Sequence, residues 1–230
     1  MFANFDFDVI RRSLGYLFFD GMTFTLTLTG LAALGGLIFG TLIALMRLSG
    51  FKLLGRIAGL YVDLMRSLPL VLVIFWFYFL VPYIGQWLTG SSRPIHVGAF
   101  GSSLITFVMF EAAYFSEIMR AGIQSISKGQ PAAAPALGLT YSQTMRYVVL
   151  PQAFRNMLPV LLTQTIVLFQ DTSLVYVLSI PDFLGAASNV AQRDGRLVEM
   201  YLFAAVVYFI ISFAASFGVR RLQARIAFVH

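Results

Sequence analysis

Long apolar runs recur along this chain, separated by shorter polar or basic stretches. A helix that crosses a bilayer needs about 20 predominantly apolar residues. Five stretches approach that length: Met22–Met46, a run within Ser67–Ser92, a run from about Ile95 to Met119, a run between Pro159 and Pro181, and Met200–Val219. We therefore predict an all-α integral membrane fold with five transmembrane helices.

The first apolar run holds two patterns that bear on its structure. Threonine occupies every second position from Thr23 to Thr29, as it would on a strand. That alternation is too short to build a barrel, and a single open strand in lipid would leave its backbone groups unpaired. Further on, Gly36 and Gly40 form a Gly-x-x-x-Gly pair, which predicts close packing against another helix.

The segments outside the runs divide the chain. Residues 1–20 mix phenylalanines with aspartates and arginines, which favours an amphipathic helix at the membrane interface. The basic stretch Arg47–Arg66 is interpreted as a loop. It contains Gly50–Ile57, a near miss for a phosphate-binding loop that lacks the required Lys and Ser/Thr, so we expect no ATP hydrolysis by this chain. The predicted division is a segment 1–20, a membrane domain 21–221 and a tail 222–230.

The composition of the chain is that of a protein surrounded mostly by lipid. Only 11% of the 230 residues are charged and 59% are hydrophobic, whereas a soluble domain carries about 25% charged residues. The net charge of +6 indicates orientation in a membrane before it indicates nucleic acid. With no cysteine and two histidines, His96 and His230, we expect no metal site. There is also no pattern of catalytic residues, so we expect a chain that is not an enzyme.

The basic residues are unequally divided between the two sides of the predicted membrane domain. Of the 16 lysines and arginines, one side holds only Arg11, Arg12, Arg93, Arg193 and Arg196. Because loops rich in Lys and Arg face the cytoplasm, we expect a periplasmic N-terminus and a cytoplasmic C-terminus. We expect the location to be a bacterial inner membrane.

Three polar side chains within the runs are candidates for a translocation pathway. Glu111 lies about 21 Å along the third helix at 1.5 Å per residue, and Asp171 lies near the middle of the fourth run. Gln164 precedes Asp171 by two helical turns and shares its face. An ionisable residue inside the bilayer indicates a functional site by default, although pairing between helices remains open for both carboxylates. Glu117 and Arg120 have the spacing of a structural ion pair.

The stretch Gly129–Pro151 connects the third and fourth runs and is rich in Pro and Gly. It resembles the cytoplasmic coupling loop of bacterial ABC-importer permeases, whose pattern is Glu-Ala-Ala, three free positions, Gly, nine free positions, Ile, one free position and Leu-Pro. The matching positions are Ala132, Ala133, Ala134, Gly138, Val148, Leu150 and Pro151. Ala132 stands where the family has Glu, and Pro135 falls in what the resemblance implies is a short coupling helix. We expect Gly138 to form a turn that a side chain would strain.

The resemblance extends over nearly the whole chain. Glu111–Ile126, Leu150–Arg155 and Gln170–Val177 are similar to permeases of polar amino acid importers, with most similarity to those for glutamate and aspartate. The resemblance implies the type I ABC permease fold and contact with membrane lipid. It also implies partners: an ABC ATPase dimer, which holds ATP and magnesium, a second permease subunit and a periplasmic substrate-binding protein. No cofactor is then expected in this chain.

The charged residues of the predicted spans do not by themselves identify the class of substrate. The predicted spans hold Glu111 and Asp171 but no arginine or lysine at mid-membrane depth, which on charge alone favours a cationic substrate. The resemblance instead implies glutamate and aspartate. The alternatives are a permease for a basic amino acid or glutamine, half of an ion-coupled secondary transporter, and a membrane scaffold without transport. A permease dimer is expected, as a heterodimer or a homodimer, because five helices are too few to enclose a pathway.

Overall fold

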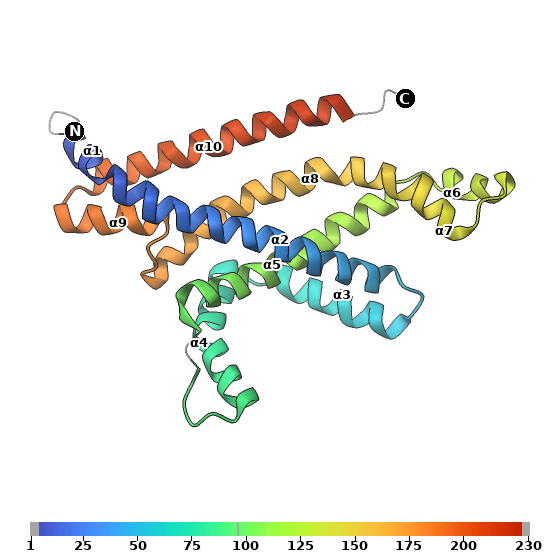
Figure 1. The fold of residues 1–230 in the computed structure, drawn as a ribbon, viewed down its shortest axis with the longest axis horizontal. Helices are drawn as coiled ribbons and strands as arrows, with labels where there is room; N and C mark the ends of the chain where they lie inside the picture. Colours follow the sequence, from blue (N-terminus) through green and yellow to red (C-terminus); the bar gives the residue numbers. More distant parts are fainter. Residues whose placement is uncertain (1–4, 96, 227–230) are drawn as a thin grey trace.

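The computed structural model describes residues 5–95 and 97–226, and all of the regular secondary structure in this part of the chain is helical (Figure 1). The elements are α1 (Phe7–Gly15), the π-helical segment η1 (Tyr16–Met22), α2 (Thr23–Leu48), α3 (Lys52–Ser67), α4 (Leu70–Thr89), α5 (Gly98–Gln124), α6 (Gly129–Ala133), the 3₁₀ turn η2 (Ala134–Leu137), α7 (Tyr141–Thr144), the π-helical segment η3 (Met145–Val149), α8 (Leu150–Asp171), the 3₁₀ segment η4 (Thr172–Leu178), α9 (Phe183–Asp194) and α10 (Leu197–Ile226).

Five helical runs are long and apolar enough to cross a membrane, as predicted. They are Phe7–Leu48, Leu70–Thr89, Gly98–Gln124, Tyr141–Leu178 and Leu197–Ile226. The first run includes α1 and η1, so the N-terminal amphipathic helix continues into the first predicted span without a break. Residues 1–4 and 227–230 of the predicted terminal segments, and both histidines, lie outside the described residues.

Helices α2 and α5 form the centre of the bundle, where they cross in close contact (Figure 1). The predicted Gly-x-x-x-Gly pair makes this approach possible. A Cβ added at Gly36 would lie 2.7 Å from the Cβ of Glu111, and one added at Gly40 would lie 2.9 Å from the Cβ of Phe115. The backbones therefore approach to a distance that only glycine permits, and this contact fixes the position of α5 relative to α2.

The prediction that Arg47–Arg66 forms a loop was wrong, because Lys52–Ser67 is helix α3. Its buried residues Ala58, Val62 and Met65 recur at helical spacing, and Val62 and Met65 pack with Val73 and Phe110 in one apolar cluster. Basic residues at both ends of the segment concealed this stripe in the sequence. The chain is extended at Leu68 and Pro69 before α4 begins, and α4 points away from the other helices (Figure 1).

The fourth helix begins earlier than predicted. The sequence placed its start at Pro159, but α8 begins at Leu150 and includes Pro159 in its interior. Pro151 lies in the first turn of α8, which follows the π-helical segment η3 without a break. Asp171 is therefore the last residue of α8 rather than a residue near its middle, and the chain continues as η4 to Ser179, which has a positive φ of 58°.

Helix α9, which the sequence did not predict, joins η4 to α10. Its N-cap is Asp182, which is buried and accepts hydrogen bonds from the N–H groups of Gly185 (2.9 Å) and Leu184 (3.1 Å). The N–H of Phe183 donates to Thr25 Oγ1 at 3.0 Å, which fastens the start of α9 to α2. A short amphipathic helix with a side-chain cap can thus fold between two spans without being long enough to cross a membrane.

Ion pairs join α1 to the segment between α9 and α10. Arg12 donates to Asp194 at 3.1 Å, and Arg196 lies 3.7 Å from Asp6 and 3.2 Å from Glu199. The hydrogen bond from Arg193 lowers the pKa of the Asp194 carboxyl to about 2, so Asp194 is ionised at neutral pH. These contacts bring together three of the five basic residues that the sequence assigned to one side, namely Arg12, Arg193 and Arg196.

We predict that Gly40→Ala destabilises the protein. The added methyl group would also lie 3.0 Å from Ala112 O and Ser116 N, which are backbone atoms that cannot rotate away. Overpacking of this kind costs about 1–3 kcal/mol, or about 2–4 °C in melting temperature per kcal/mol. Thermal unfolding in detergent checks this.

The matched control is Gly30→Ala in the same helix, where an added Cβ has no atom within 4 Å. It should melt at or above the wild-type temperature because alanine favours a helix over glycine by about 1 kcal/mol. Equal melting temperatures for the two variants would show that the packing of α2 against α5 does not depend on the glycine contact.

Candidate functional site

Glu111 lies at the contact of α2, α5 and α8. Its side chain is buried, with 1% of the residue exposed. Oε1 accepts a hydrogen bond from Gln164 Nε2 at 3.2 Å, while Oε2 is buried and has no partner in the described part of the chain. The structure thus brings together Glu111 and Gln164, which the sequence had placed on separate helices without pairing them.

Asp171 occupies a different environment from Glu111. It ends α8, where the regular helix gives way to η4, and its side chain is only partly buried. Among the described residues, no hydrogen bond or ion pair is recorded for its carboxylate. Asp171 and Glu111 are close enough to interact electrostatically. Of the three predicted pathway residues, buried Glu111 and half-buried Gln164 therefore form a hydrogen-bonded pair, and Asp171 lies apart from them.

Glu117 forms the centre of an ion-pair cluster near the C-terminal end of α5. The predicted pair with Arg120 is present, and Arg47 at the end of α2 also donates to the Glu117 carboxylate. The sequence analysis missed Arg47 as a partner, although its position after the last apolar turn of the first run was a usable signal. The cluster connects the C-terminal turn of α2 with α5 beyond the glycine contact.

The connection between α5 and α8 is a series of short helical segments rather than an irregular loop. Ala132 and Ala133 are exposed on α6 or at its end, and Ala134 is buried beneath them. Gly138 ends the following turn with a positive φ of 75°, as the sequence predicted. Thr140 and Gln143 then form a reciprocal capping box that starts α7. The connection is therefore ordered by its own local hydrogen bonds.

The surface of this connection is apolar and exposed. Leu137 and Tyr141 are 80% and 82% exposed. A groove of about 410 Å³ lies beside them, lined by residues that include Ala133, Leu137 and Val148. Leu150 and Pro151, the last two positions of the predicted motif, are exposed at the start of α8. All six residues predicted for coupling therefore lie in one continuous region. Ala134 is the only one of these six that is buried.

Comparisons with known proteins agree with one another. Residues 36–228 match the family described as binding-protein-dependent transport system inner membrane component. The glutamate/aspartate import permease protein GltK of Escherichia coli is 53% identical over 97% of this chain and 99% of its own. The probable glutamine ABC transporter permease protein GlnP of Bacillus subtilis is 34% identical over 90% of this chain and 92% of its own.

Solved structures share the fold. An amino acid ABC transporter crystallised with histidines has a chain that is 32% identical, with a TM-score of 0.84 over 96% of this chain and 98% of that one. A chain of the MetNI methionine ABC transporter, in an inward-facing conformation, superimposes with a TM-score of 0.74 at 18% identity over 93% of this chain and 97% of its own. The second similarity is one of fold alone.

The sequence family, the five membrane-length helices and the fold all indicate the same class of protein. The chain belongs to the inner membrane components of binding-protein-dependent transport systems, the non-catalytic permease subunits of ABC importers.

Proposed function

We propose that this chain is a permease subunit for the import of acidic amino acids, glutamate and aspartate, driven by ATP hydrolysis on a partner. The observation that carries the proposal is the 53% identity to a glutamate/aspartate import permease over nearly the full length of both chains. The similarity to a glutamine permease is weaker, at 34%. Membership in a binding-protein-dependent family favours ATP-driven import over an ion-coupled mechanism.

The alternative substrate is glutamine or a basic amino acid. It is supported by Glu111 and Asp171, which bring negative charge into the membrane domain. The structure reduces the weight of this charge argument, because Glu111 is buried against α2 and hydrogen-bonded to Gln164. A carboxylate enclosed in this way contributes to packing between helices and is not exposed to a passing substrate.

We infer that the α6–η3 connection is the surface that receives an ABC ATPase. Its exposed Leu137 and Tyr141 are large apolar side chains outside the predicted spans, where a partner surface can cover them. Because Ala132 replaces the acidic residue of the family pattern, docking depends on shape and apolar contact rather than on that charge. ATP and magnesium are bound by the ATPase dimer and not by this chain.

The proposed orientation places this connection and the C-terminal end of α10 in the cytoplasm. Both lie on the same side of the molecule in Figure 1, as does the C-terminal end of α2, whose last turn contains Arg47. The opposite end, with α1 and α9, is then periplasmic and available to a substrate-binding protein. The division of basic residues between the two ends supports this assignment.

A second permease subunit completes the proposed assembly. Helices α4 and α10 are largely exposed in the single chain, and five spans do not enclose a pathway. Within that assembly we assign Asp171 to the translocation pathway, with Glu111 and Gln164 as the buried support of α8. Asp171 fits this role because it is partly exposed at a break between α8 and η4, and broken helices are frequent at transporter substrate sites.

The substrate proposal predicts a specific competition pattern. In proteoliposomes that contain this chain with its ATPase, second permease and binding protein, unlabelled aspartate should suppress the uptake of labelled glutamate, and arginine and glutamine should not. Competition by arginine or glutamine without competition by aspartate would contradict the acidic substrate and support the alternative.

The coupling proposal predicts that Gly138→Val reduces both uptake and ATPase stimulation about ten-fold while the subunit remains in the membrane. The left-handed conformation at Gly138 costs a residue with a Cβ about 1–2 kcal/mol, and about 1.4 kcal/mol corresponds to a factor of ten. The control is Gly138→Asn, because asparagine tolerates this conformation and an added Cβ has open space around it. Normal coupling in Gly138→Val would exclude this turn from the ATPase contact.

The pathway proposal predicts that Asp171→Asn lowers uptake at least about ten-fold, the range expected when a charge-assisted hydrogen bond is lost. The amount of subunit in the membrane should stay close to wild type. The control is Asp63→Asn, which removes an exposed carboxylate on α3. If protein abundance falls in proportion to uptake in Asp171→Asn, the residue is structural and not part of the pathway.

A further inference from the structure

A polar ridge runs along the C-terminal half of α10. Tyr208, Ser212, Ser216 and Arg220 follow one another at intervals of four residues and therefore lie along one side of the helix. At 1.5 Å per residue the ridge is about 18 Å long and starts about 17 Å from the beginning of α10. In the proposed orientation it extends from mid-membrane to the cytoplasmic surface.

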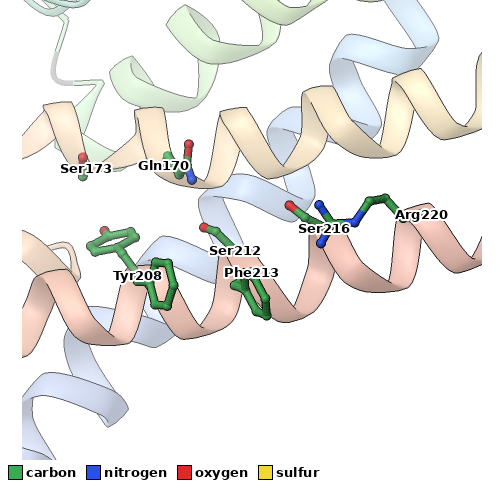
Figure 2. Close-up of a pocket in the computed structure, with 8 residues that line it drawn as sticks. Gln170, Ser173, Tyr208, Ser212, Phe213, Ser216 and Arg220 are labelled. Atoms are coloured by element: carbon green, nitrogen blue, oxygen red, sulfur yellow. The ribbon is translucent and has the colours of Figure 1, made fainter.

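The ridge forms one wall of a groove of about 440 Å³. The opposite wall is made by Gln170 at the end of α8 and Ser173 in η4. In Figure 2, Ser212 and Ser216 lie on the side of α10 that faces α8, Arg220 extends back along α10 toward Ser216, and Phe213 is directed away from α8. Exposing these polar side chains to lipid would cost free energy. We therefore expect water, a ligand or protein to occupy the groove.

Ser212 provides independent evidence that the groove has an occupant. Only 7% of the residue is exposed, and its Oγ is buried without a hydrogen-bond partner in the described part of the chain. Buried hydroxyl groups are almost always hydrogen-bonded in proteins. An occupant that accepts or donates a hydrogen bond at Ser212 would satisfy this group.

The charge of the groove identifies the kind of occupant. Arg220 is its only charged lining residue, and no ion pair is recorded for it among the described residues. The neighbouring Arg221 has a different role, because its guanidinium lies 4.3 Å from the centre of the Phe217 ring. A guanidinium presents donors in a planar fork that matches a carboxylate, and serine hydroxyls can complete the contact.

We propose that this groove is the cytoplasmic release site of the permease, where Arg220 binds a carboxylate of the departing amino acid and Ser212 and Ser216 contact its polar groups. This inference rests on the proposed function and adds to it a cation that the mid-membrane spans lack. A single positive charge at the exit favours an acidic substrate without the tight binding that would slow its release.

Thiol labelling tests the site without depending on transport. The chain contains no cysteine, so Ser216→Cys introduces a single reporter that can be followed by mass spectrometry of this subunit in the assembled complex. An anionic methanethiosulfonate should modify it faster than a cationic one. Adding Arg220→Gln should reduce this rate ratio about five-fold or more because the positive charge is removed.

The matched control is Arg221→Gln, which removes an adjacent positive charge outside the groove and should leave the ratio unchanged. Glutamate should slow the labelling of Ser216→Cys, and arginine should not. If neither reagent modifies the cysteine, or if Arg220→Gln and Arg221→Gln give the same ratio, the groove is not an anion site open to water and the inference is overturned.

Transport measurements separate this inference from the proposed function. Arg220→Gln should lower maximal glutamate uptake about ten-fold, with the concentration for half-maximal uptake unchanged, and Arg221→Gln should stay within about two-fold. No acidic amino acid uptake by the wild type would overturn the proposed function. If the wild type takes up glutamate and the two variants do so at equal rates, the release site is overturned and the proposed function is not.

A lipid phosphate is the competing source of negative charge. The labelling ratio and the uptake are therefore measured in zwitterionic vesicles and in vesicles that contain anionic phospholipid. An effect of Arg220→Gln that is equal in both supports a carboxylate of the substrate. An effect confined to anionic vesicles assigns Arg220 to a lipid headgroup and overturns the release site.

Discussion

The close contact between α2 and α5 is the constraint on which the rest of the structure depends. In lipid, no hydrophobic force drives helices together, so association relies on close packing and on hydrogen bonds between helices. Gly36 and Gly40 allow that packing, and the ion pair from Arg47 to Glu117 continues the same contact toward the helix ends. Glu111 follows on the same face of α5 and extends the contact to α8 through Gln164. Three spans are thus held in register by one seam of glycines and carboxylates.

Long apolar runs with few charges were sufficient to predict the five spans, because a helix that crosses a bilayer requires length and low charge. The glycine pair and the turn at Gly138 could also be predicted, since each depends on local geometry that only glycine satisfies. The turn at Gly138 is formed by adjacent residues, whereas the sequence shows the glycine pair but not that α5 is the helix that packs against it.

The features that sequence reasoning missed depend on packing or on competing signals. Helix α3 was predicted to be a loop because the basic residues Lys52, Arg56 and Arg66 occupy the same segment as its buried apolar residues. Pro159 was taken as the start of a helix, whereas it is a buried residue in the interior of α8. The pairing of Glu111 with Gln164 needed the relative rotation of α5 and α8, which no single run of residues contains. The polar ridge on α10 was readable at four-residue spacing, but its significance depends on the buried hydroxyl of Ser212.

The exposed apolar surface of the α6–η3 connection has a consequence for the life of the subunit in the cell. Leu137, Tyr141 and Tyr147 are large side chains that are open to solvent in the single chain. Surfaces of this kind promote aggregation and attract chaperones and proteases when no partner covers them. If the proposed ATPase covers this surface, a subunit made in excess of the ATPase is short-lived, and the scarcer of the two chains sets the abundance of the assembled transporter.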